Sequence, residues 1–413
     1  MADVDVLVIG AGVVGLALAQ GLRKAGLRMA ICEQDSDDTY YGRPRDWGIT
    51  LHWGFELIAK LLPPELHSHI DEILCDPFYK QSEQDADLVT YAGHTGKVLI
   101  RTPASTARSV SRKKMRRLFS QGLEIQYAQR LVNIEISDDS ATAVFEDGQR
   151  LTAKLIIGCD GSRSRVRSML VDPETAKVKK LGINLVNFGA KFDQETALLI
   201  RKQHPIFSNS VHPSGYMYFL RILDVPDPDE AESWTFQNIF GWKGAPYASD
   251  FASKTEQTQW LKAKASEFAQ PWRTVLSNIP DDTVFTIDSI NTWRPVGWSA
   301  SPLQGKVTLA GDAAHASTPI RGQGLNNGLE DAVQLLGRLS SAEKTDEGLR
   351  HGVQGYEEET IERGRRDVDL SESSALGMFD YNQLLNSPQA KLGLKKSQAS
   401  DVEPVDSGTS TPV

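Results

Sequence analysis

Three glycines stand at the spacing that lets a protein backbone approach a pyrophosphate. They lie in Gly10-Ala11-Gly12-Val13-Val14-Gly15, directly after an apolar strand-like run, and Glu33 ends the next such run. Gly10 would allow a tight turn, Gly12 would let the pyrophosphate reach the backbone, and Gly15 would let the following helix pack on the strand. Free N–H groups at the helix start favour phosphates, and Glu33 would accept hydrogen bonds from a ribose. The pattern predicts a dinucleotide site; the alternative is a tight turn without a ligand.

Two later strand-like runs each end in an aspartate. Residues 155–159 lead into Asp160 and Gly161, with Ser164 and Arg167 behind them, and residues 307–311 lead into Asp312. The second run continues through Pro319-Ile320-Arg321-Gly322-Gln323-Gly324-Leu325-Asn326-Asn327 into a helix with one apolar stripe, Leu325, Leu329, Ala332, Val333 and Leu336. Taken alone, Asp160 is explained as a turn residue and Asp312 as a helix cap.

In this order and at these separations, the three motifs resemble the flavoprotein aromatic monooxygenases of the para-hydroxybenzoate hydroxylase type, in particular members that tailor natural products. The resemblance covers roughly residues 3–170 and 293–340. It implies that Glu33 holds the adenosine ribose of FAD, that Asp312 holds the ribityl chain, and that Asp160 sits between the flavin and nicotinamide sites.

The helix start after residue 319 suits an electron-rich flavin ring. Gly322 and Gly324 flank Gln323, so unhindered N–H groups of residues 324–326 can face a ring oxygen, and the helix dipole favours the negative charge of a reduced flavin. Pro319 fixes the incoming backbone, and the resemblance implies that its carbonyl faces the substrate. For Asn326, a direct flavin contact and an ordinary role in the first helical turn remain open.

Two arginines are candidate phosphate or flavin ligands. The resemblance to a family loop that wraps over the flavin, here 41–48, places Arg45 at the pyrophosphate, where its planar fork matches phosphate geometry. Arg112 begins an expected helix at a position where family members commonly contact FAD. The alternative for Arg112 is a solvated basic face, because five basic residues occur in 112–117. The resulting set of expected cofactor-binding residues is Gly10, Gly12, Val14, Gly15, Glu33, Arg45, Arg112, Asp160, Asp312, Gly322, Gly324, Leu325 and Asn326.

Asp46 is a candidate catalytic acid or base, together with Pro319 at the substrate. The resemblance places Asp46 in the segment that lines the flavin ring, and a carboxylate there could exchange a proton with substrate if burial adjusts its pKa. The alternative is a turn residue or a partner for Arg43.

Other constellations predict no further chemistry. The eight histidines are scattered, no metal site is expected, and His315 is interpreted as a packing or supporting residue. The chain has no Gly-X-Ser-X-Gly segment, which excludes the corresponding hydrolases. Trp234, Trp242, Trp293 and Trp298 are expected in the core or on sheet faces. If an inserted sheet roofs the flavin, Gln237 or Asn187 would face the substrate.

The chain that positions these residues is large enough for two packed domains. It has 413 residues, 40% of them hydrophobic, and a net charge of -9 without an extended basic run, which argues against nucleic acid as a partner. Three well-separated cysteines indicate free thiols in a reducing compartment. With no membrane span or signal peptide visible, the protein is expected to be soluble and cytoplasmic, as a monomer or homodimer.

The expected fold class is α/β. A Rossmann-like FAD-binding domain at 1–175 resumes at 293–386 after an inserted, mostly antiparallel β-sheet substrate domain at 176–292. Expected elements include a meander of strands at 131–136, 141–146 and 150–158, strands at 183–192, 206–223 (with a turn at 212–215) and 234–242, and a helix at 255–268. Residues 387–413, poor in large apolar side chains, are expected to form a disordered tail.

The resemblance implies an FAD-dependent monooxygenase. It would use NADPH, or NADH, and dioxygen to hydroxylate or epoxidise a small aromatic or polycyclic electron-rich substrate through a flavin hydroperoxide. The alternatives are a flavin-dependent oxidoreductase or halogenase on the same fold, or a non-catalytic lipid carrier. The Trp-X-Trp-X-Ile-Pro run of the halogenases is absent, and retention of all three nucleotide motifs argues against a carrier.

Overall fold

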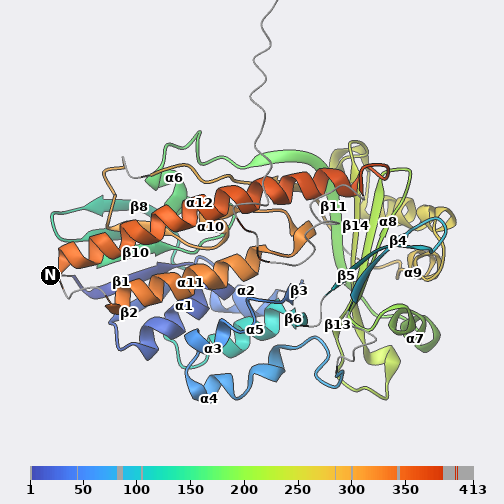
Figure 1. Ribbon diagram of the computed structural model, residues 1–413, viewed down its shortest axis with the longest axis horizontal. Helices are drawn as coiled ribbons and strands as arrows, with labels where there is room; N and C mark the ends of the chain where they lie inside the picture. Colours follow the sequence, from blue (N-terminus) through green and yellow to red (C-terminus); the bar gives the residue numbers. More distant parts are fainter. Residues whose placement is uncertain are drawn as a thin grey trace, which may run out of the picture.

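The protein consists of two large sheets joined by helices (Figure 1). The structure is a computed structural model that describes residues 2–43, 45–80, 87–103, 106–283, 285–298, 301–341 and 345–384, with Lys396 and Gln398. The sequence-based expectation of a Rossmann-like part and a second, mostly antiparallel sheet is confirmed.

The first sheet has the order β7-β2-β1-β10-β9-β8, and β16 pairs with the second half of β10. Strands β7, β2, β1, β10 and β16 run parallel, whereas β8 to β10 form the expected antiparallel meander. The bounds are β1 Val4–Ile9, β2 Met29–Cys32, β7 Ile125–Gln126, β8 Leu131–Ile136, β9 Ala141–Phe145, β10 Arg150–Gly158 and β16 Val307–Leu309. Because the carboxyl ends of parallel strands share one edge, β1, β10 and β16 bring the three sequence motifs together there.

Strand β1 is buried on both faces, as expected for a central parallel strand. Val6 and Val8 pack into a cluster with helices α1, α3, α5 and α11, and Leu7 and Ile9 pack on the opposite side with β8, β9 and α6. The helices of this part are α1 Val13–Lys24, α2 Asp37–Gly42, α3 Ile58–Leu61, α4 Pro64–His67, η1 Ile70–Ile73, α5 Arg112–Phe119, α6 Arg165–Leu170, α10 Asp312–His315, η6 Pro319–Arg321 and α11 Gly324–Ser341.

The second sheet has the order β15-β11-β14-β13-β12-β4-β5, with only β12 and β4 parallel. Its strands are β4 Asp87–Ala92, β5 Val98–Pro103, β11 Lys179–Ala190, β12 Phe207–Val211, β13 Tyr216–Asp224, β14 Thr235–Lys243 and β15 Ile287–Thr292. The three strand runs and the turn expected in this block are confirmed. Strands β4 and β5 come from the first block of the sequence, so the sheet draws on more of the chain than 176–292.

One face of the second sheet packs against α7 Gln194–Gln203, α8 Lys254–Ala263 and α9 Trp272–Ser277, which lie on its outer side in Figure 1. The helix expected at 255–268 is α8 followed by the 3-10 helix η5 Lys264–Glu267. Two further 3-10 turns are η3 Ala231–Ser233 and η4 Ala248–Asp250. The other face looks toward a short two-stranded ribbon, β3 Gly48–Leu51 and β6 Arg108–Ser111, which belongs to the first part.

Helix α12, Asp346–Met378, runs along the molecule from the first sheet to the second (Figure 1). Its Val353 and Tyr356 pack into the core beside α1, whereas Ala375 and Met378 pack on the inner face of the second sheet. The sequence did not suggest so long a helix, because its apolar stripe is weak. The tail expected at 387–413 lies outside the described residues except for Lys396 and Gln398.

Three global features bear on the sequence-based expectations. Cys32, Cys75 and Cys159 are free and buried, as expected. No helix within the described ranges is long and apolar enough to cross a membrane. The described residues also include no group of three or more histidine, cysteine or acidic side chains arranged to hold a metal ion.

Candidate functional site

The glycine turn after β1 leaves room in front of Gly12 alone. A Cβ added at Gly10, whose φ is +106°, would lie 2.6 Å from the Cys159 oxygen, and one at Gly15 would lie 2.1 Å from the Gly10 oxygen. At Gly12 the only atom within 4 Å would be the Cys159 oxygen, at 4.0 Å. Gly10 and Gly15 are therefore required by the fold, whereas the space at Gly12 is open to a ligand.

Glu33 is tied to the glycine turn by one carboxylate oxygen and to its own loop by the other. Its Oε2 accepts a hydrogen bond from the Ala11 N–H at 2.9 Å, and its Oε1 accepts from the Asp35 N–H at 3.1 Å. Tyr40 supports the same turn by donating its hydroxyl to the Ala11 carbonyl at 2.7 Å, and the Arg116 guanidinium lies over the Tyr40 ring. Each oxygen of Glu33 keeps a lone pair, so a ribose contact remains compatible with this role.

Asp312 begins α10 beside the glycine turn. Gly311, with φ at +64°, packs on Val14, which also fills the space in front of Gly328. The Asp312 carboxylate is open to solvent, and none of the described residues donates a hydrogen bond to it. Although the side chain is exposed, the protein packed around it displaces part of the water and raises the pKa of Asp312, while His315, Arg112 and Arg167 act in the opposite direction.

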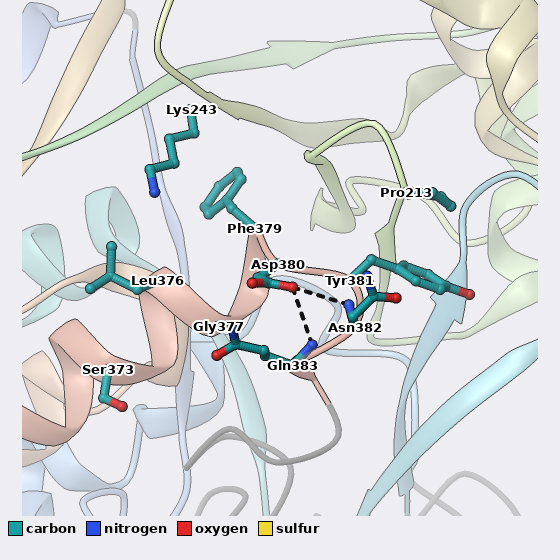
Figure 2. A pocket seen from close by; sticks show the side chains of 10 residues that line it. All are labelled: Pro213, Lys243, Ser373, Leu376, Gly377, Phe379, Asp380, Tyr381, Asn382 and Gln383. Atoms are coloured by element: carbon teal, nitrogen blue, oxygen red, sulfur yellow. Dashed lines mark hydrogen bonds between the residues drawn. The ribbon is translucent and has the colours of Figure 1, made fainter.

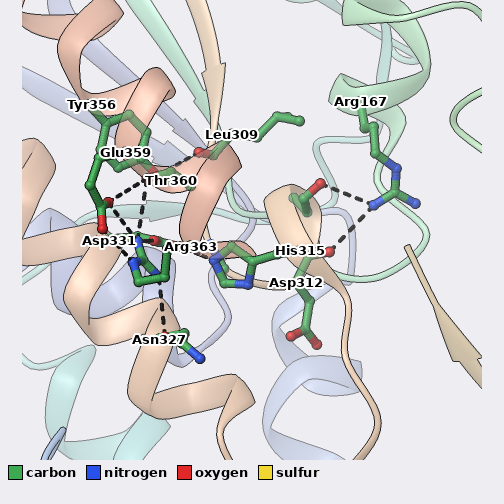
Figure 3. Close-up of polar contacts among 12 residues, drawn as sticks. Arg167, Leu309, Asp312, His315, Asn327, Asp331, Tyr356, Glu359, Thr360 and Arg363 are labelled. Atoms are coloured by element: carbon green, nitrogen blue, oxygen red, sulfur yellow. Dashed lines mark hydrogen bonds and ion pairs between the residues drawn. The ribbon is translucent and has the colours of Figure 1, made fainter. Parts of the chain in front are cut away.

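The backbone around Asp312 is held by a buried ionic network (Figure 3). Asp331 accepts from the Gly311 N–H at 2.7 Å, from His315 Nε2 at 2.7 Å and from Arg363 Nη2 at 2.6 Å. Tyr356 donates to the Leu309 carbonyl at 2.8 Å. These bonds anchor α11 and α12 to the end of β16, and they confirm the supporting role expected of His315. Sequence reasoning missed Asp331, although it lies in the helix that follows the third motif, and Arg363, which lies near no recognised motif.

Arg112, at the start of α5, has no partner for its charge among the described residues. Its guanidinium makes no hydrogen bond or ion pair with the part of the chain that the structure describes, and its backbone N–H donates to the Trp47 carbonyl at 2.9 Å. Burial lowers the pKa of Arg112, and the positive charges of Arg116 and Arg43 lower it further. Arg112 and Asp312 are close enough to influence each other electrostatically. The Arg112 guanidinium and the Asp312 carboxylate thus lie in the same region, each without a hydrogen-bond or ion-pair partner among the described residues.

Asp160, in contrast, is saturated by its own chain. Its carboxylate accepts from Ser164 Oγ at 2.5 Å, from the Arg165 N–H at 2.6 Å and from the Val166 N–H at 3.2 Å, which caps α6. Arg167 then links α6 to the second motif, since its Nη1 donates to the Ala313 carbonyl at 3.1 Å. This geometry favours the turn-and-cap interpretation of Asp160, and a contact between two nucleotide sites remains a prediction.

The start of α11 carries the second open cradle. Gly322 has φ at +61° with nothing within 4 Å of an added Cβ, and a Cβ at Gly324 would first meet the Ser317 hydroxyl at 3.5 Å. Pro319, the first residue of η6, is exposed, and Leu325 is half-buried against the α1 cluster.

Asn326 uses its whole side chain to join α11 to the segment after β3. Its Oδ1 accepts from the N–H groups of His52 at 3.2 Å and Gly54 at 3.0 Å, and its Nδ2 donates to the carbonyls of Thr50 at 3.3 Å and Gly322 at 2.9 Å. Of the two roles left open for Asn326, this geometry favours the structural one.

Arg45 lies at the junction of the two sheets. Its Nη2 pairs with Asp288 of β15 at 3.1 Å, and its guanidinium stands 4.5 Å from the centre of the Trp47 ring. Arg43, two residues earlier, pairs with Asp35 and lies within electrostatic reach of Arg112. The pyrophosphate contact expected of Arg45 remains a prediction.

Asp46 is held against the start of α5. Its Oδ1 accepts from the backbone N–H groups of Trp47 at 2.7 Å and Lys113 at 2.9 Å, and its Oδ2 accepts from the Ser111 hydroxyl at 2.5 Å. Arg43, the partner considered from the sequence, pairs with Asp35 instead. The bonds favour a structural role for Asp46, and its catalytic role remains a prediction.

The inner face of the second sheet closes the site opposite the motifs. Gln237 Oε1 accepts from the Gly48 N–H at 2.9 Å, and its Nε2 donates to Asn187 Oδ1 at 3.1 Å. Arg221, one strand further, is buried beside them and donates to Thr50 Oγ1 at 2.6 Å. Gln237 and Asn187 thus lie on the inward face, as expected. Sequence reasoning missed Arg221, although an arginine inside the apolar strand run 216–223 was a signal.

An open hollow lies elsewhere, at the end of α12 (Figure 2). It has a volume of about 590 Å³ and is lined by residues that include Lys243, Phe379, Asp380 and Tyr381. None of the sequence-predicted site residues lines it, so it is distinct from the candidate site.

The motif residues suit a dinucleotide such as FAD. Gly12, Gly322 and Gly324 leave backbone exposed without side chains in front, and the half-buried Arg112 and the exposed Asp312 present charges without partners among the described residues. A ligand that carries phosphate and hydroxyl groups could bind both charges.

Comparison with protein families supports this interpretation. The family described as "FAD binding domain" matches residues 3–48 and 108–371. The FAD-dependent monooxygenase cctM of Talaromyces islandicus is 36% identical over 392 residues, which are 95% of this chain and 97% of that protein. The FAD-dependent monooxygenase phnB of Penicillium herquei is 30% identical over 393 residues, 94% of each chain.

Solved structures share the fold at low sequence identity. HpxO of Klebsiella pneumoniae, crystallised with FAD and uric acid, superposes with a TM-score of 0.72 at 19% identity and covers 93% of this chain and 90% of its own. FqzB superposes with a TM-score of 0.73 at 17% identity, covering 94% and 88%.

Proposed function

Because the chain belongs to the FAD binding domain family and is an FAD-dependent monooxygenase, we propose that it uses NADPH or NADH with dioxygen to oxygenate an aromatic or polycyclic small molecule. The proposed reaction is the hydroxylation or epoxidation of a natural-product intermediate. The relatives cctM and phnB are fungal monooxygenases of similar length, and the natural-product setting of such enzymes supports this substrate class.

FAD would be held at three places that share the carboxyl edge of the first sheet. The open backbone at Gly12 would accept the pyrophosphate, Glu33 the ribose and Asp312 the ribityl hydroxyls. Arg112 would supply a positive charge within electrostatic reach of Asp312. The presence of two charges without partners among the described residues, Arg112 and Asp312, within electrostatic reach of each other is the observation that carries this assignment.

Bound FAD supplies the redox chemistry: it takes two electrons from the nicotinamide and activates dioxygen. The chain orients the reacting groups and excludes water. N–H groups at the start of α11 would stabilise negative charge on the flavin ring without a cationic side chain. The inner face of the second sheet would cover the substrate, since it already packs on β3 through Gln237 and Gly48.

The test combines spectroscopy with turnover. Purified protein is expected to be yellow, to oxidise NADPH faster in the presence of an aromatic substrate, and to give a product heavier by one oxygen atom. A panel of aromatic acids, indoles and polyketides, each assayed with NADPH and NADH, would define substrate and donor. Flavin-containing protein that oxidises NADPH without oxygenating any compound would favour a simple oxidoreductase instead.

A matched pair of variants tests the cofactor assignment. Arg112→Met is expected to lower FAD affinity at least tenfold, because a charge-assisted contact is lost. Arg117, five residues along the same helix, is exposed, so Arg117→Met removes the same charge without touching the site. Equal FAD affinity in both variants would overturn the role of Arg112. We further propose a cytoplasmic monomer or homodimer, which chromatography with light scattering and cell fractionation would test.

A further inference from the structure

His52 is a buried histidine whose two ring nitrogens lack hydrogen-bond partners. It directly follows β3 and is 4% exposed. Neither Nδ1 nor Nε2 has a partner among the described residues. Buried polar side chains are nearly always hydrogen-bonded, because burial removes the water that would otherwise bind them. The imidazole is therefore a candidate contact for a group that the chain itself does not supply.

The contacts on either side of His52 show which way its ring faces. Leu51 and Trp53 both pack into the core cluster that includes α1 and α5. Successive side chains of an extended segment point to opposite faces, so Thr50 and His52 face away from that cluster. On this face, Thr50 Oγ1 accepts a hydrogen bond from Arg221 of the second sheet at 2.6 Å. His52 therefore faces the region between the two sheets, where the flavin ring is proposed to lie.

The turn that starts α11 adjoins His52. The His52 backbone N–H donates to Asn326 Oδ1 at 3.2 Å, and Asn326 Nδ2 donates to the Gly322 carbonyl at 2.9 Å. Arg321, next to Gly322, is close enough for its charge to act on the imidazole. The open backbone at Gly322 and Gly324 is the proposed cradle of the flavin ring. His52 thus lies at the edge of that cradle.

The imidazole of His52 is neutral near pH 7. Burial, aided by the positive charge of Arg321, lowers the pKa of His52 to about 4. A neutral imidazole has one N–H donor and one lone pair. The charge of Arg321 favours the tautomer whose lone pair faces the guanidinium, because that orientation of the ring dipole has the lower energy. The other nitrogen then carries the N–H, and His52 offers a single hydrogen-bond donor.

A flavin ring provides acceptors whose strength depends on its redox state. The carbonyl oxygens of the ring are neutral acceptors in oxidised FAD. Reduction by two electrons and one proton leaves the ring with one negative charge. A hydrogen bond to a charged acceptor is roughly twice as strong as one to a neutral acceptor. A donor placed against such an oxygen therefore stabilises reduced FAD more than oxidised FAD.

We propose that His52 donates a hydrogen bond to an oxygen of the flavin ring and so binds reduced FAD more tightly than oxidised FAD. The inference rests on the proposed function and adds one side chain to the backbone N–H groups expected to face the ring at the start of α11. It also accounts for a buried imidazole without a partner in the described chain, because the cofactor supplies the acceptor.

A role of His52 in folding alone predicts a different response to substitution. Because the imidazole has no partner among the described residues, His52→Leu removes an unsatisfied polar group and breaks no side-chain hydrogen bond of the described chain. The thermal midpoint of the apoprotein should therefore stay unchanged or rise. A lower midpoint combined with unaltered FAD binding would show that the imidazole serves packing, and would overturn the inference.

The test measures the reduction potential of bound FAD, which reports the ratio of the affinities for its two redox states. Reduction of the FAD-loaded protein by dithionite with an indicator dye, together with titration of apoprotein with oxidised FAD, gives both affinities without NADPH or substrate. His52→Leu is expected to weaken the binding of reduced FAD about tenfold more than that of oxidised FAD, which lowers the potential by about 30 mV. His52→Phe, which also lacks a donor, should behave alike.

Two further variants separate the hydrogen bond from packing. Asparagine and glutamine each place an amide N–H near one of the two ring nitrogens, so His52→Asn or His52→Gln should restore at least half of the lost potential. If neither does, the shift arises from packing and the inference fails. His351→Leu is the control, because His351 is exposed on α12 and its replacement should leave the potential at the wild-type value.

A potential in His52→Leu or His52→Phe that equals or exceeds the wild-type value would overturn the inference. So would an equal shift in His351→Leu, or the failure of both donor-free variants to fold. These results leave the proposed function intact as long as wild type binds FAD and oxygenates an aromatic compound. Wild-type protein that binds no FAD would overturn both.

Discussion

Asp160 and Asp312 each follow a strand of the first sheet, β10 and β16, but their hydrogen-bonding surroundings in the fold differ. Asp160 receives three hydrogen bonds, from Ser164 and from the N–H groups of Arg165 and Val166, which begin α6. Asp312 receives none from the described residues, although it too begins a helix. A strand that ends in an aspartate therefore does not by itself define a ligand site. What separates the two is whether the chain supplies the donors.

The same division runs through the rest of the site. Asp331 and Asp46 are each saturated by three donors from the protein, whereas Arg112 and Arg221 keep unmet charge. Groups that make all of their hydrogen bonds within the protein stabilise the folded chain, since removing one leaves its donors without an acceptor. Unmet groups destabilise the chain alone and are explained by a ligand that completes them. The two classes should therefore respond differently to substitution.

The largest contrast is expected between two glycines of the first turn. Gly12→Val should yield folded but colourless protein, because an added Cβ meets no atom of the described residues closer than 4.0 Å and the side chain would occupy the space proposed for the pyrophosphate. Gly15→Val should fail to fold, because its Cβ would lie 2.1 Å from the Gly10 oxygen. Circular dichroism and the flavin absorbance of both variants check this. Full flavin occupancy in Gly12→Val would show that the N-terminal assignment is wrong.

Among the carboxylates, Asp331 should matter most for folding. Asp331→Asn breaks a buried ion pair with Arg363 and is expected to cost about 3 to 5 kcal/mol of unfolding free energy, measured by denaturant titration. Burial opposes ionisation of Asp331, but His315 and Arg363 prevail and lower its pKa below 3.8. Its contribution is thus complete above that pH and is lost as the pH falls toward the folded pKa. A variant as stable as wild type at pH 7 would contradict this network.

Asp312→Ala should instead weaken FAD binding while the fold persists. Loss of a hydrogen-bonded carboxylate is expected to cost roughly 1.5 to 3 kcal/mol of binding free energy, about 10- to 150-fold in Kd. Asp160→Ala is the natural comparison: it should lower the thermal midpoint by removing the cap of α6 and change the FAD Kd less. Titration of both apoproteins with FAD decides, and equal losses of affinity would erase the distinction between the two aspartates.

Asp46→Asn tests the comparison at the residue whose role the sequence left open. The N–H₂ group of the amide would face at least one of the groups that now donate a hydrogen bond to the carboxylate. Because two donors cannot bond to each other, we expect a loss of about 1 to 2 kcal/mol in the free energy of unfolding. The ratio of product to NADPH consumed should stay near wild type. A fall in product of about 10²-fold, with unchanged flavin content and leakage to hydrogen peroxide, would instead establish Asp46 as a catalytic acid or base.

The sequence predicted those parts of the fold whose signals are local. The glycine turn, the meander at 131–158 and the hairpin at 212–215 rest on neighbouring residues, and all three are confirmed. The addition of β4 and β5 to the second sheet, and the course of α12, depend on contacts between distant segments that no short pattern encodes. The same limit explains why Arg221 was missed, since its unmet donors appear only once β3 is packed on β13.

The smallest effect is expected at the C-terminus. Lys396 pairs with Glu330 at 3.3 Å and lies 4.8 Å from the centre of the Trp53 ring, while Trp53 donates to Gln323 at 3.0 Å. A partly exposed ion pair and a cation–π contact are each worth at most about 1 kcal/mol, so truncation after Ser387 should change the thermal midpoint by only a few degrees and leave flavin content unchanged. Lys396→Met in the full chain isolates the same contacts.

Acid titration sharpens this last expectation. Burial opposes ionisation of Glu330, but the hydrogen bond from Gln334 and the charge of Lys396 lower its pKa below 4.5. The stabilisation is therefore present above that pH and is lost as the pH falls through the folded value. The difference between wild type and Lys396→Met should accordingly vanish on acidification. Loss of flavin on truncation, or a fall of more than about 10 °C in the thermal midpoint, would contradict this expectation. Either result would mean that the C-terminal segment contributes contacts to the FAD site.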